Sequence, residues 1–76
     1  MNKYYVTFGQ NHYHDLCGIK LHHDVVAEFS ALSYDSARMM AFQLFSTQWC
    51  WLSDAIPSLA FYSQGIVNID SVVEAL

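Results

Sequence analysis

The segment Tyr34–Phe45 constrains the fold most, because its apolar residues recur at the spacing of an amphipathic helix. One side of that helix would carry Ala37, Met40, Ala41, Leu44 and Phe45. Ser33 is placed to cap the N-terminus, and Asp35 follows in the first turn, where a negative charge suits the helix dipole. A helix with one apolar side needs a second layer to cover that side, and the flanking segments must supply it.

The segments before this helix have the alternation of strands. Tyr4–Phe8 predicts a first strand, and Ile19–Ala31 predicts a second extended run. The later half of that run places Ala27, Phe29 and Ala31 on the inward side. The short spacing between the two runs favours an antiparallel hairpin with a wide loop.

The segments after the helix are shorter. Trp49–Leu52 predicts a buried third strand, Leu59–Tyr62 and Ile66–Ile69 are expected to pair as late strands, and Asp70–Leu76 adds a short helical turn. We therefore predict one α+β domain over residues 1–76. Its elements follow the order ββαβ(β), and a small antiparallel sheet carries one main helix on one face.

The apolar content exceeds what so small a core can hide. The chain has 76 residues, of which 54% are hydrophobic and 16% aromatic, whereas a domain of this size buries only about 60% of its unfolded surface. Apolar patches that reach the surface usually mark interaction sites. The aromatic candidates for a recognition surface are Tyr5, Tyr13, Trp49, Trp51, Phe61 and Tyr62.

Strand alternation would place Trp49 and Trp51 on one face of the third strand, with Cys50 and Leu52 on the other. One of the two tryptophans is expected in the core. Apolar residues on both sides of a sheet with one helix imply a cover for its open face. That cover is the C-terminal segment, a second copy of the chain, or a target protein.

The charge distribution argues against nucleic acid as a partner. The net charge is −4, and the only basic residues are Lys3, Lys20 and Arg38, too few to neutralise a phosphate backbone. A mildly acidic domain suits a basic protein surface better. No apolar run approaches the length of a bilayer span, so we expect a cytoplasmic protein with no membrane association.

The densest group of metal-ligand residues is His12-x-His14-x-x-Cys17, with His22 and His23 shortly after. Imidazole nitrogen and thiolate sulfur are preferred zinc ligands, and a structural site takes four of them. We predict a structural zinc bound by His12, His14, Cys17 and His23, with His22 and Cys50 as alternatives for the fourth ligand. The other interpretation is a polar loop in which Cys17 is a small buried hydrophobe.

Enzymatic chemistry is not expected from this sequence. Either Cys17 or Cys50 beside a histidine would offer a nucleophile, but neither has an oxyanion loop or an orienting partner. The glycines Gly9, Gly18 and Gly65 stand apart and form no phosphate-binding loop.

Several short strings also resemble a family of small phage and prophage proteins from Gram-positive hosts. The matching strings are Tyr4-Tyr5-Val6-Thr7-Phe8-Gly9-Gln10, His12-x-His14, Ser33-Tyr34-Asp35-Ser36-Ala37-Arg38 and Phe45-Ser46-Thr47-Gln48-Trp49. The resemblance covers roughly residues 4 to 52. In size, acidity and histidine loop the chain is also similar to an anti-CRISPR protein that blocks Cas9.

The resemblance implies a phage-encoded inhibitor that binds a host defence protein, namely a CRISPR effector such as Cas9. Zinc would then be structural in the histidine loop. The alternative is a small homodimeric phage structural or assembly module without inhibitory activity.

Overall fold

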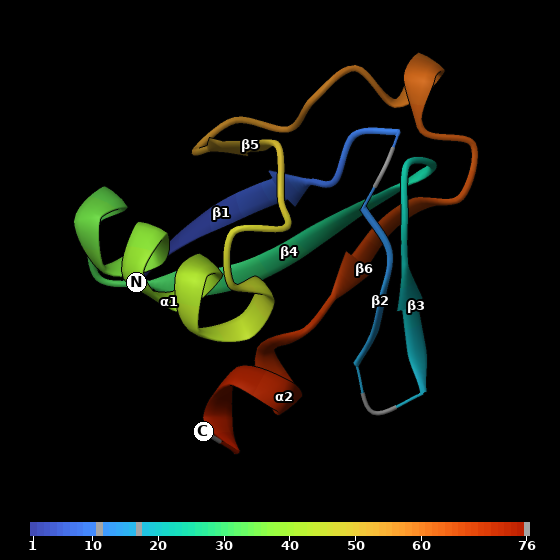
Figure 1. Ribbon diagram of the computed structural model, residues 1–76. Helices are drawn as coiled ribbons and strands as arrows, with labels where there is room; N and C mark the ends of the chain where they lie inside the picture. Colours follow the sequence, from blue (N-terminus) through green and yellow to red (C-terminus); the bar gives the residue numbers. More distant parts are fainter. Residues whose placement is uncertain (11, 17, 76) are drawn as a thin grey trace.

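The computed structural model describes residues 1–10, 12–16 and 18–75, and Figure 1 shows how its elements are arranged. A four-stranded sheet has the order β5-β1-β4-β6, and β2 and β3 form a separate hairpin. The strands are β1 (Asn2–Thr7), β2 (His14–Leu16), β3 (Ile19–Leu21), β4 (Val25–Ala31), β5 (Trp51–Ser53) and β6 (Gly65–Asn68). The helices are α1 (Tyr34–Phe45), the 3₁₀ turn η1 (Leu59–Phe61) and α2 (Asp70–Glu74).

The main helix α1 occupies the residues that the sequence predicts. The Ser33 hydroxyl accepts the Ser36 backbone N–H at 3.2 Å, so the predicted N-cap is confirmed. At the other end Ser46 has a φ of 57°, and its N–H donates to the Phe42 carbonyl at 2.9 Å. With a ψ of −126° Ser46 is neither helical nor in the αL conformation common at helix ends, and the chain leaves the helix after this last bond.

The core lies between α1 and one face of the sheet. Alternate residues of β1 and β4 supply the sheet side, and the apolar side of α1 covers them. Phe8 and Phe45 meet edge to face with ring centres 5.0 Å apart. The buried cluster comprises Tyr4, Val6, Phe8, Leu21, Val25, Ala27, Phe29, Ala31, Ala37, Ala41, Phe45, Leu52 and Ile69. The α+β class, with one main helix packed on the sheet, is therefore confirmed.

The second extended run differs from its prediction. It divides into β3 and β4, because the chain turns at residues 22–24 and the Val25 N–H donates to the His22 carbonyl at 3.2 Å. The later part, β4, pairs antiparallel with β1 as expected. The earlier part, β3, pairs instead with β2, a stretch the sequence indicated as loop.

The late strands also differ from their prediction. Residues 59–61 form η1, and β6 pairs with β4 in parallel, so the sheet is mixed where we expected it to be antiparallel. The third strand starts at Trp51, two residues later than predicted. The helical turn predicted after residue 70 is present as α2.

Within the described residues, none of the helices combines the length and the apolarity that crossing a bilayer requires.

Candidate functional site

The face of the sheet opposite α1, here called the outer face, carries the residues that alternate with the core. Cross-strand partners share a face, and the register pairs Tyr5 with Glu28, Glu28 with Asn68, and Thr7 with Trp51. Tyr5 and Thr7 are buried, whereas Trp51 is 65% exposed. The outer face therefore combines a covered centre with an exposed tryptophan at its β5 edge.

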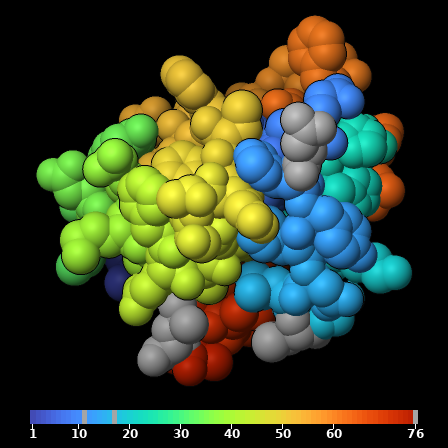
Figure 2. Space-filling model, in the orientation of Figure 1, coloured from blue at the N-terminus to red at the C-terminus, as the bar shows by residue number. Residues whose placement is uncertain are grey.

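The 3₁₀ turn η1 brings a second large aromatic residue to this region. Phe61 is 78% exposed, and Figure 2 shows the η1 segment, in orange, standing out at the top of the molecule. Phe61 and Thr7 line the same hollow, and Thr7 is also the strand partner of Trp51. We call Trp51 and Phe61 together the aromatic surface.

The hollow beside the aromatic surface has a volume of about 250 Å³. Its lining is Thr7, Gly9, Gln10, His23, Cys50, Phe61 and Tyr62. Gly9 has a φ of +65°, and a side-chain carbon there would lie 3.4 Å from the Cys50 Cβ. Glycine at this position therefore allows both the turn after β1 and the close approach of Cys50. The Cys50 thiol is free and exposed.

A polar network crosses the outer face at Glu28. The Glu28 Oε1 accepts the Asn68 amide at 2.8 Å and the Lys3 ammonium at 3.4 Å. The Asn68 amide does most to hold the pKa of Glu28 below its usual value, and the Tyr5 hydroxyl and Lys3 add to it against the effect of burial. Burial raises the pKa of Tyr5, and the Glu28 carboxylate raises it further.

Asp70 extends this network beyond the end of β6. Its Oδ1 accepts the Ser30 backbone N–H at 2.7 Å, and its Oδ2 accepts the Ser30 hydroxyl at 3.3 Å. The Asp70 N–H in turn donates to the Asn68 side-chain oxygen at 3.0 Å. The carboxylate thus satisfies a β4 donor just past the parallel β4–β6 pairing, which ends at Asn68.

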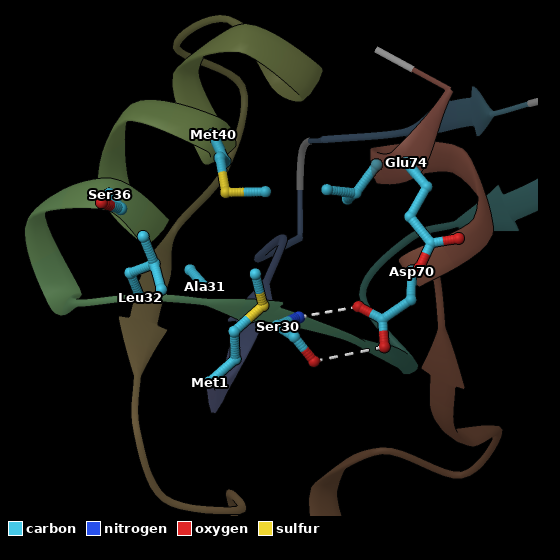
Figure 3. A pocket seen from close by; sticks show the side chains of 9 residues that line it. Met1, Ser30, Ala31, Leu32, Ser36, Met40, Asp70 and Glu74 are labelled. Atoms are coloured by element: carbon cyan, nitrogen blue, oxygen red, sulfur yellow. Dashed lines mark hydrogen bonds between the residues drawn. The ribbon is translucent and has the colours of Figure 1, made fainter.

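A groove of about 440 Å³ lies between α1 and α2, next to this carboxylate. Figure 3 shows Met1, Leu32 and Met40 on one side of it and Asp70 and Glu74 on the other. The groove is therefore mostly apolar, with acidic groups along the α2 side.

His14, one of the predicted zinc ligands, joins the β2–β3 hairpin to the core. Its Nε2 is 2.7 Å from the Gln48 carbonyl oxygen, so that nitrogen donates a hydrogen bond. Its ring lies 5.6 Å from the Phe8 ring and 5.1 Å from the Phe45 ring, centre to centre. His14 therefore has a packing role that needs no metal.

His23 lies apart from this anchor, in the turn between β3 and β4. Each of His22, His23 and Asp24 offers a ligand atom within 4.8 Å of the other two, and the structure brings together these three metal-ligand residues among those it describes. His12 is half-buried in the segment between β1 and β2. Cys17 lies outside the described residues, so the predicted four-ligand loop site stays a prediction.

Trp49 and Trp51 do not share one strand face as alternation predicted, because β5 begins only at Trp51. Trp49 precedes β5 and packs against the core cluster, and its indole N–H donates to the Ser46 carbonyl at 3.1 Å. Its ring meets the Phe42 ring at 5.3 Å. Of the other aromatic candidates, Tyr5 is buried, Tyr62 is half-buried, and Tyr13, Trp51 and Phe61 are exposed.

Sequence reasoning missed the network that joins Glu28, Asn68 and Asp70. Glu28 is 40 positions away from Asn68 along the chain, and the parallel β4–β6 pairing brings the two together. The sequence offered one local signal, the Asn68-x-Asp70 spacing that is typical of a side chain bonding to a backbone N–H two residues later.

Comparison with protein-family models, with curated proteins and with solved structures finds no match.

Proposed function

We propose that this chain is a non-enzymatic protein-binding module whose contact site is the aromatic surface. The observation that carries the proposal is the exposure of Trp51 and Phe61, at 65% and 78%. Both lie near Thr7, because Trp51 is its partner in the β1–β5 pairing and Phe61 lines the same hollow. Tryptophan dominates the binding energy of many interfaces, and large aromatic side chains are enriched there. Phe61 also lines the hollow, so a side chain of the partner protein can fill the hollow while it packs against the exposed ring.

The distribution of positive charge favours a protein as that partner. Lys3 is paired with Glu28 at 3.4 Å, and the Arg38 guanidinium lies over the Phe42 ring at 5.1 Å. These contacts engage two of the three basic side chains on the protein itself. Nucleic-acid affinity rests mainly on Lys and Arg at phosphates, which this surface supplies poorly.

The resemblance to small phage proteins suggests which kind of protein the partner is, namely a defence protein of the host. An inhibitor of a host defence protein acts by occupying a surface that its target needs, and a small acidic domain with exposed aromatic residues fits such a role. We therefore propose a CRISPR effector such as Cas9 as the first partner to test.

The test is a Cas9 cleavage assay with purified protein in large excess over the nuclease. The variant Trp51→Thr/Phe61→Gln removes both aromatic rings while keeping a β-forming residue in β5. The matched control is Met39→Gln, since Met39 is 72% exposed but lies on α1. Inhibition by the wild type and the control, but not by the double variant, supports the proposal.

Two outcomes contradict parts of it. Unaltered cleavage with the wild-type protein removes Cas9 as the partner. Inhibition that survives in the double variant removes the aromatic surface as the contact site. Light scattering on the same samples is a further check, because a dimer abolished by the double variant would instead support the homodimeric assembly module.

A further inference from the structure

The turn between β3 and β4 gathers three metal-ligand side chains that are consecutive in the sequence. His22, His23 and Asp24 each have one ligand atom within 4.8 Å of the others. His23 Nε2 and Asp24 Oδ2 are 3.4 Å apart. Two ligand atoms bonded at 2.0–2.1 Å to a tetrahedral zinc lie about 3.3 Å apart, so this pair already has the separation of two ligands on one ion.

The lone pair of His22 is also directed into the turn. The Asp24 backbone N–H donates to His22 Nδ1 at 3.3 Å, a long hydrogen bond. That bond requires an unprotonated Nδ1, so Nε2 carries the proton in the neutral ring. A metal ion bound at His22 Nδ1 would take the place of the Asp24 backbone N–H, and the proton on Nε2 would stay in place.

The surrounding structure fixes the turn. The Val25 N–H closes it on the His22 carbonyl at 3.2 Å, and the Asp24 carbonyl accepts the Gln64 N–H at 3.1 Å. Figure 1 shows the turn beside the segment that leads into β6. The Tyr13 ring stacks on the His22 ring, with centres 6.5 Å apart and planes within 10°. Because these three contacts already restrict the turn, it loses little conformational entropy when it binds an ion.

The charge at Asp24 is available for a cation. Among the described residues its ion-pair partner is His23, while Lys3 pairs with Glu28. Two imidazoles and a carboxylate form a donor set that suits zinc and its neighbours in the first transition row.

We propose that His22, His23 and Asp24 form a surface site for a divalent cation of the zinc class. The ligands are His22 Nδ1, His23 Nε2 and an Asp24 carboxylate oxygen. Three protein ligands leave a fourth position open to water or to a group from a second protein. This site differs from the predicted loop site, since of that set it uses only His23, and it goes beyond the proposed binding function.

The experiment is calorimetric titration of zinc into the full chain, made without a polyhistidine tag. We expect one zinc per chain, with affinity falling about tenfold or more in His23→Ala and in His22→Ala. His12→Ala and Cys17→Ser are the matched controls, and both should bind zinc as the wild type does. Circular dichroism of each variant checks that the fold is retained.

A second measurement needs no variant. Zinc added to the ¹⁵N-labelled wild-type protein should shift the ring nitrogens of His22 and His23 and leave those of His12 and His14 in place. Absence of zinc binding overturns the proposal. So does binding that Cys17→Ser or His12→Ala abolishes, because the ion would then lie in the predicted loop site.

Discussion

The two faces of the four-stranded sheet are built from alternate residues of the same strands, yet they carry different kinds of side chain. On the α1 face, β4 presents Ala27 and Phe29, which are fully buried in the core cluster. On the outer face the same strand presents Glu28, bonded to Asn68 and Lys3. The edge strand β5, which pairs with β1, presents exposed Trp51 on the same face.

This difference shows how a small domain divides its functions. One main helix can cover only one face of the sheet, and the period of two along each strand assigns every second residue to the other face. Here that face holds a hydrogen-bonded network and an aromatic edge. Stability should therefore depend chiefly on the α1 face, and binding on the outer face.

The largest expected effect is on the α1 face. Phe29→Ala removes a fully buried ring from the centre of the core, and we expect it to lower the free energy of unfolding by about 3–5 kcal/mol. That is a large share of the stability of any small domain. Urea unfolding followed by tryptophan fluorescence measures it. A loss as small as that of a surface change would contradict the assignment of the core.

The next effect is at the end of the polar network. Asp70→Ala leaves the Ser30 N–H without its 2.7 Å acceptor, and we expect a loss of about 1.5–3 kcal/mol. Asp70→Asn keeps an oxygen at Oδ1 and is the matched control, with a smaller loss expected. Equal losses for the two variants would show that the carboxylate acts through its charge alone.

A smaller effect is expected where the β2–β3 hairpin meets the core. His14→Ala removes the hydrogen bond to the Gln48 carbonyl and the contacts with Phe8 and Phe45, at a cost of about 1–2 kcal/mol. The loss should be the same with added zinc and with a chelator, because the anchor needs no metal. A loss that appears only in the presence of zinc would instead place His14 among the ligands.

The pH dependence of stability tests the outer face. The pKa of Glu28 is lower in the folded chain than its ordinary value of 4.5, chiefly because of the Asn68 amide. The ionised Glu28 side chain therefore contributes its full share of the folding stability at a pH above 4.5, and this share is lost as the pH falls through the lower pKa of the folded state. Unfolding of the wild type and of Glu28→Gln from neutral to acidic pH should show a shallower fall for the variant. Parallel curves would contradict the network.

The sequence predicts the elements whose signals are local. The bounds of α1 follow from the Ser33 cap and the spacing of its apolar residues, and both are present in the structure. The β4–β6 pairing was not predictable in this way. It joins residues about 40 positions apart, and alternation within β6 does not specify whether its partner runs parallel or antiparallel.

The candidate site follows the same division. Trp51 and Phe61 were recognisable as aromatic candidates, but their exposure depends on where β5 begins and on η1 replacing a predicted strand. The cluster of His22, His23 and Asp24 depends on a turn that divides a run predicted as continuous.

The most direct test of the division between the two faces is urea unfolding of Trp51→Thr/Phe61→Gln beside the wild type. Exposed side chains usually change stability by no more than about 0.5 kcal/mol each. We therefore predict that the double variant unfolds within about 1 kcal/mol of the wild type. A loss comparable to that of Phe29→Ala would contradict the account, because the aromatic surface would then be part of what holds the fold together.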